Sequence, residues 1–121
     1  MPQETILVVD DETANLRMVI GDVSGKSFPA ALYGAVFSGQ LRALIPGTAS
    51  PAEALEILNN NLVARYQSGN YIAVTHCSLD PADGSGILAN SGMPFPFLVR
   101  SRSITRLNVP GAPLGLMEEI R

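Results

Sequence analysis

The acidic residue with the clearest setting for chemistry is Asp22, which lies near the end of the apolar run from Leu16 to Val23. The run is typical of a β-strand, and Gly21 and Gly25 permit tight backbone geometry on both sides of the carboxylate. A helix-like segment begins just beyond, at Phe28. A carboxylate at the end of a strand is a suitable ligand for a hard cation such as Mg²⁺ or Mn²⁺. We therefore expect Asp22, with Gly21 beside it, to be a metal-binding position.

A second pair of acids, Asp10 and Asp11, follows the apolar residues from Ile6 to Val9. If both apolar runs form an antiparallel hairpin, direct opposition gives the pairs Asp10–Arg17 and Thr5–Asp22. The two acidic sites would then be several residue rises apart and would not share a cation. If residues 13–18 are helical instead, the geometry stays open. Asp10 and Asp11 are weaker metal candidates, and a solvated strand end is the alternative interpretation.

Four other side chains invite a chemical interpretation. Lys26 precedes a helix N-terminus and is a weak phosphate-binding candidate, with a solvated lysine as the alternative. Ser24 adjoins Asp22, but the sequence places no histidine or lysine base beside it. His76, the only histidine, lacks partners for a triad or a zinc cluster and is expected to be a structural strand residue. Cys77, the only cysteine, is expected in the core.

The elements that must position these residues follow from hydrophobic spacing. An apolar segment, Phe28–Ile45, predicts a helix that is covered on most sides. A capping box at Ser50 predicts a second helix, Ser50–Gln67, with Asn59 on its polar face. Period-two runs then predict four strands, Tyr71–Leu79, Gly86–Asn90, Phe95–Arg100 and Ile104–Val109. Short turns between them favour one antiparallel meander with both helices on its inner face. The expected fold class is α+β.

The segment from Gly21 to Leu32, Gly-Asp-Val-Ser-Gly-Lys-Ser-Phe-Pro-Ala-Ala-Leu, resembles the signature of SpoIIE-like serine phosphatases, a bacterial branch of the metal-dependent PPM family. Ser27 stands where that family usually has glycine. Two later segments, Asn90-Ser91-Gly92-Met93-x-Pro and Gly111-Ala-Pro-Leu-Gly115, resemble further family segments in the same order. Ser91 and Met93 occupy positions where the family has alanine and histidine.

The opening residues, Ile6 to Glu12 followed by Ala14 to Arg17, resemble instead the first strand of a response-regulator receiver domain. In receivers, paired acids at that strand end help to bind magnesium. We expect residues 1–19 to be a receiver-like strand, with one helical turn, and a junction. Residues 20–121 are expected to form a partial SpoIIE-like domain, so that the chain is a truncated chimera.

The resemblance implies a partial PPM-type sandwich and hydrolysis of phosphoserine or phosphothreonine on regulatory proteins, such as sigma-factor antagonists, with Mn²⁺ or Mg²⁺. Of the family's several aspartate ligands, only Asp22 has a counterpart here. We therefore expect activity to be absent or low. The alternative is a non-catalytic folding or interaction module that self-associates, most simply as a homodimer.

Composition narrows the function further. The 121 residues have a hydrophobic fraction of 46% and a net charge of −3, which is ordinary for one globular domain and argues against a nucleic-acid partner. A single cysteine fits a reducing compartment. No long apolar stretch or signal-peptide pattern is present, so a cytoplasmic location and no membrane partner are expected.

Overall fold

The computed structural model describes residues 4–12, 15–24, 28–47, 50–65 and 71–115. The elements follow in the order β1 (Glu4–Glu12), β2 (Asn15–Val23), α1 (Phe28–Leu44), a 3-10 turn η1 (Ile45–Gly47), α2 (Pro51–Arg65), β3 (Ile72–Leu79), β4 (Gly86–Ser91), β5 (Phe97–Arg100) and β6 (Ser103–Arg106). The predicted α+β class is confirmed. None of the described helices is long and apolar enough to cross a membrane.

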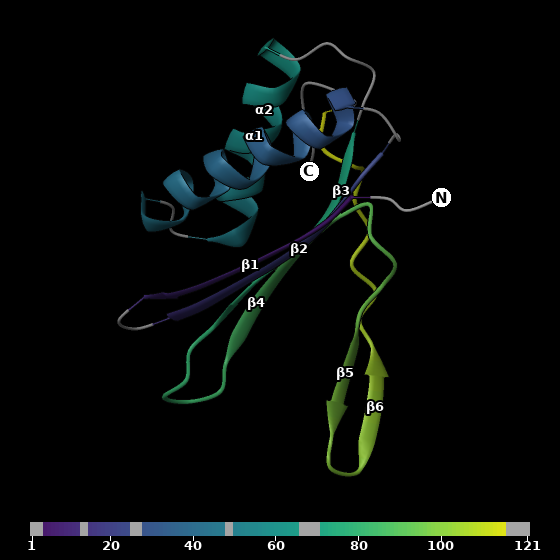
Figure 1. Cartoon of the computed structure of the whole chain (residues 1–121). Helices are drawn as coiled ribbons and strands as arrows, with labels where there is room; N and C mark the ends of the chain where they lie inside the picture. The colour runs from purple at the N-terminus through teal and green to yellow at the C-terminus, as the bar shows by residue number, and fades with distance from the viewer. Residues whose placement is uncertain (1–3, 13–14, 25–27, 48–49, 66–70, 116–121) are drawn as a thin grey trace.

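Four strands form one antiparallel sheet in the order β1-β2-β3-β4. Both helices lie on one face of this sheet, with α1 over β1 and β2 and α2 over β3 and β4 (Figure 1). Alternate strand residues point to that face, among them Val19, Val23, Ile72 and Val74, and all four are buried. They pack against buried helix side chains, which are Phe37, Leu41, Leu55, Leu58 and Leu62.

The start of α2 is the capping arrangement that the sequence predicts. The Ser50 hydroxyl accepts a hydrogen bond from the Glu53 backbone N–H at 3.2 Å, and Pro51 takes the first helical position, where a missing N–H costs nothing. The predicted polar face of α2 is wrong at one residue. Asn59 is fully buried, and its side-chain oxygen accepts a hydrogen bond from the Gly115 N–H at 2.8 Å. It joins the end of the described chain to the helix.

The expected single meander from Tyr71 to Val109 is wrong. β5 and β6 pair only with each other, as a separate two-stranded sheet that extends away from the main one (Figure 1). The reason lies at Gly92, which follows β4 with a φ of 86° and turns the chain off the edge of β3. Beyond the end of β4, Leu114 pairs with Ile72 of β3 instead, through two backbone hydrogen bonds, one in each direction, of 3.0 and 2.8 Å.

The first helix is less enclosed than its apolar sequence predicts. Leu32 exposes 51% of its surface, and Ala35, Gly39 and Ala43 are exposed on the same side at helical spacing. The helix therefore has one covered side, on which Phe37 and Leu41 lie, and one side that no described residue covers.

Candidate functional site

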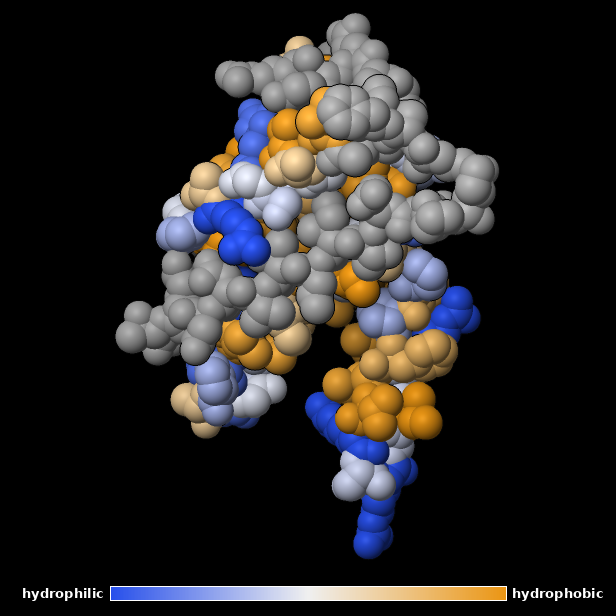
Figure 2. Space-filling view, viewed as in Figure 1, coloured by the Kyte–Doolittle hydropathy of each residue, from blue (hydrophilic) through white to orange (hydrophobic). Residues whose placement is uncertain are grey.

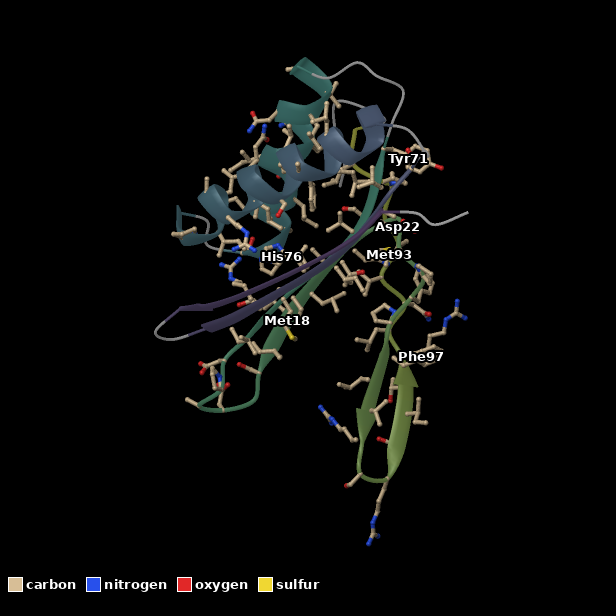
Figure 3. The ribbon with its side chains drawn as sticks, viewed as in Figure 1. Met18, Asp22, Tyr71, His76, Met93 and Phe97 are labelled. Carbon is tan, nitrogen blue, oxygen red and sulfur yellow. The ribbon has the colours of Figure 1, made fainter. Side chains whose placement is uncertain are left out.

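Asp22 lies at the end of β2 that leads toward α1, and its side chain is half-buried. Its register partners are Thr5 on β1 and Ala73 on β3, so neither neighbouring strand places an acid directly beside it. Because Gly21 and Val23 are buried toward the helices, Asp22 belongs to the opposite, open face of the sheet. Figure 3 shows it at the end of the sheet where Tyr71 and Met93 also lie.

Ser24, the residue directly after β2, is hydrogen-bonded to the backbone of Tyr71. The Ser24 hydroxyl accepts a hydrogen bond from the Tyr71 N–H at 2.8 Å, and the Ser24 N–H donates to the Tyr71 carbonyl at 2.8 Å. Ser24 thus continues the β2–β3 pairing by one residue, and its oxygen is engaged with the backbone. This is a structural role. Gly25, Lys26 and Ser27 fall outside the described residues, so the predicted phosphate site at Lys26 stays a prediction.

Of the two arrangements considered for the N-terminal residues, the structure forms the antiparallel hairpin, β1 with β2. Asp10 is paired with Arg17 and Thr5 with Asp22, as direct opposition predicts. The helical alternative for residues 13–18, and with it the receiver-like helical turn, is wrong, because β2 begins at Asn15. Arg17 and Asp22 are five positions apart on β2, which places the backbone of Asp10 about 16 Å from that of Asp22 along the sheet. Asp11, paired with Leu16, lies one residue farther away.

These positions bear directly on whether a divalent cation fits. Mg²⁺ and Mn²⁺ take about six oxygen ligands, and two-cation sites hold their ions about 4 Å apart with several shared carboxylates. Among the described residues, no three His, Cys, Asp or Glu side chains come together in a way that could hold a metal ion. The described residues therefore do not fit a two-cation site.

His76 lies on the other face of the sheet, between β3 and the helices (Figure 3), and is fully buried. Its Nε2 is 3.5 Å from the Arg17 guanidinium, so Nε2 accepts and the neutral ring carries its proton on Nδ1. Burial, and then the Arg17 charge, lower the pKa of His76 from 6.5 to about 4, although the nearby Pro51 carbonyl partly opposes the shift. His76 is a neutral core residue, as the sequence analysis expects.

Cys77 points to the open face and is half-buried, which is less burial than predicted. Partial burial raises the pKa of its thiol and makes the thiolate rarer. The apolar side chains just after β4 are also not fully buried. Met93 and Phe95 are half-buried, whereas Phe97 exposes 63% of its surface.

One polar residue that the sequence analysis did not single out as a site organises the region around Met93. Asn90 donates two hydrogen bonds of 2.9 Å, to the carbonyls of Met93 and Val109, and its oxygen accepts from the Met93 N–H at 3.0 Å. Gly111 packs so closely on the Asn90 backbone that a Cβ there would collide with the carbonyl oxygen. Two segments that carry the family resemblance, around Asn90 and around Gly111, therefore meet in space as a scaffold.

A surface cavity of about 430 Å³ adjoins this scaffold. It lies between α2, β4 and the segment 109–112, and its polar lining comes from Glu56, Asn90 and Ser91. The Asn90 side chain is already hydrogen-bonded to the backbone of Met93 and Val109 and to the Thr75 hydroxyl, so the cavity has few polar groups that converge on a ligand.

An antiparallel sheet with two helices on one face is a fold that the chain shares with a solved structure. This is the structure of the RsbU and RsbW domains of Rv1364c from Mycobacterium tuberculosis, with a TM-score of 0.78 and 24% sequence identity. The match covers 96% of this chain and 34% of that one, so the chain spans about a third of the matched protein. At this identity the likeness concerns the fold.

The sequence model of the family described as Stage II sporulation protein E (SpoIIE) matches residues 12–121. The chain belongs to this family. The match includes the Asp22 signature, both scaffold segments and β2, and it leaves out residues 1–11. A search of curated proteins found no match.

Proposed function

We propose that this chain is a SpoIIE-type phosphatase domain of bacterial signalling whose own residues support little or no turnover. The observation that carries the proposal is the placement of Asp22. The residue lies in the family signature, at a strand end and on the open face of the sheet, but no second acid is paired with it. The substrate class proposed for the family chemistry is a phosphoserine or phosphothreonine on a regulatory protein.

Asp22, with the backbone of Gly21, is the proposed cation contact of this chain, and Mn²⁺ or Mg²⁺ is the proposed cation. Asp10 and Asp11 are poor partners because the register places them about 16 Å or more along the sheet. A single carboxylate leaves most of the roughly six coordination positions to water, so we expect weak binding.

We also propose that the receiver-like first residues reflect the origin of the sequence. In this proposal residues 1–19 derive from a receiver and residues 20–121 from a phosphatase, although the SpoIIE match itself already begins at residue 12. β2 runs without interruption from Asn15 to Val23 across the suggested junction, so both parts contribute to one strand.

The second candidate function is a non-catalytic module that self-associates as a homodimer. A specific observation favours it. The β5–β6 hairpin exposes large apolar side chains, including Val99 and Ile104, with 69% and 71% of their surfaces accessible. Exposed apolar groups that cluster on one element are typical of interaction surfaces.

The catalytic proposal is tested by measuring hydrolysis of a phosphoserine peptide and, separately, Mn²⁺ binding by calorimetry. We expect turnover near the protein-free rate and weak Mn²⁺ binding that Asp22→Asn removes. Glu56→Gln is the matched control, because Glu56 is an exposed carboxylate on α2. Turnover like that of an intact phosphatase, lost in Asp22→Asn, would show that further ligands complete the site. Equal Mn²⁺ binding in wild type and Asp22→Asn would refute the role of Asp22.

A further inference from the structure

The β5–β6 hairpin carries an apolar face that nothing described in the chain covers. Val99 pairs with Ile104 and Phe97 with Arg106, so the side chains of Phe97, Val99 and Ile104 lie on the same side of the hairpin. All three are more than 60% exposed. In Figure 2 the hairpin stands apart from the rest of the molecule, with apolar residues over its length and polar ones at its tip. An isolated two-stranded hairpin is at best marginally stable in water, so this one needs a partner.

The four-stranded sheet presents a second apolar surface, which the described residues cover only in part, on the face opposite the helices. Figure 3 shows Met18 on this face, with His76 on the other. The residues that alternate with the buried core positions of β2, β3 and β4 form this open face, and its larger apolar members are Leu16, Met18, Ile20, Cys77, Leu79 and Leu88. They are half-buried, except for Ile20, which is 41% exposed. An antiparallel sheet with two apolar faces is stable when both are covered.

The two surfaces carry opposite charges at their ends. The hairpin contains Arg100, Arg102 and Arg106 and no acidic residue, which leaves five basic and eleven acidic residues, a net charge of −6, for the rest of the chain. One end of the open face is acidic. The β3–β4 turn there contributes Asp80 and Asp83, and the register of β1 with β2 brings the backbone of Asp10, Asp11 and Glu12 to the same end.

We propose that the β5–β6 hairpin of one copy packs its Phe97, Val99 and Ile104 face on the open face of a second copy, and that the second copy does the same in return. The occupant is a second copy because one chain holds both apolar surfaces and both charge partners. With the hairpin along the strands, Arg100 and Arg102 at its tip lie over the acidic end of the sheet. In the resulting dimer each hairpin packs face to face on the sheet of the other copy, and a two-fold axis relates the two copies.

This inference rests on the second candidate function, self-association, and names the surface that performs it. It is independent of the phosphatase proposal, because no residue of the hairpin adjoins Asp22 in the register of either sheet.

The test is sedimentation of the full chain over a range of about 1 to 100 µM, since a dimer responds to concentration. We expect a dimer in wild type and at least tenfold weaker association in Ile104→Glu, because a charge in a desolvated interface centre costs more than about 1.4 kcal/mol. Thr105→Glu is the matched control. Thr105 is the next residue of β6, pairs with Leu98 and faces the other side of the hairpin, so we expect its variant to dimerise.

Cys77 supplies a second readout from within the open face, where it pairs with Met18 and Leu88. Its alkylation by a small maleimide should slow as wild-type concentration rises and should not slow in Ile104→Glu. A monomer throughout, or equal weakening by Ile104→Glu and Thr105→Glu, would overturn the proposal. A dimer whose Cys77 reacts equally at all concentrations would keep self-association and refute this interface. Weak Mn²⁺ binding by Ile104→Glu, unchanged from wild type, separates this result from the catalytic proposal.

Discussion

The buried His76 makes stability depend on pH in a direction that can be worked out from its surroundings. The ring is fully buried and faces the Arg17 guanidinium 3.5 Å away, so the protonated imidazolium is disfavoured in the folded state. The pKa is about 4 in the folded protein against 6.5 for the ordinary group. The unfolded chain therefore binds the proton first as pH falls. Stability is complete above about pH 6.5 and is lost progressively toward pH 4.

The magnitude follows from the two pKa values. Between pH 7 and pH 5, His76 alone should lower the free energy of unfolding by about 2 kcal/mol, and below pH 4 the loss should level off at about 3 kcal/mol. The assay is urea unfolding at a series of pH values and one fixed protein concentration, because self-association would add a concentration term. We expect His76→Gln to flatten the curve between pH 7 and pH 5, since the neutral amide does not titrate.

An NMR titration checks the same reasoning without a variant. His76 is the only histidine in the chain, so its ring resonances are assigned by composition alone. We expect them to shift with a midpoint near pH 4 in the folded protein. A midpoint near 6.5 while the protein remains folded would refute the argument from burial and from Arg17.

Two further predictions concern α2. Asn59→Ala should lower the free energy of unfolding by about 1 to 3 kcal/mol, because it leaves the Gly115 N–H without its 2.8 Å acceptor, and urea unfolding measures it. Asn60→Ala, at the exposed next position, gains the same helix propensity and should be neutral or slightly stabilising, so equal losses in both variants would contradict the assigned role. Ser50→Ala should cost about 1 kcal/mol in the same assay through loss of the N-cap, and Ser50→Asp should restore it.

Local signals in the sequence predicted local structure well. The N-cap at Ser50 and the strand from Leu16 to Val23 depend on neighbouring residues, and both are observed. The pairing of Asp10 with Arg17 follows if the two apolar runs form strands that lie directly opposite each other in a hairpin, and it is observed as well. Each of these features depends on residues close in sequence, which is why the pattern was sufficient.

The failures concern contacts between residues far apart in sequence. A glycine at position 92 is visible in the sequence, but not the direction in which it turns the chain, so the separate β5–β6 sheet could not be foreseen. Asn59 is a polar helix residue whose burial depends on Gly115, which lies 56 positions later. At the candidate site, the signature identified Asp22, whereas one of the hydrogen bonds that hold Asn90 goes to the Val109 carbonyl, 19 positions later in the sequence.

The pairing of β2 with β3 has a consequence for how the chain folds. Each of the hairpins β1–β2, β3–β4 and β5–β6 joins neighbouring stretches of chain, but the seam between β2 and β3 joins Leu16 to Leu79 and Val23 to Ile72, with both helices in the intervening loop. Forming a contact between residues so far apart in sequence first costs the conformational entropy of closing the whole loop. Only after that cost does the contact stabilise the fold. The Arg17–His76 contact, 59 residues apart in sequence, lies on this seam. Closing the seam is thus the step that turns two independent hairpins into one sheet, and we expect it to be the slow step of folding.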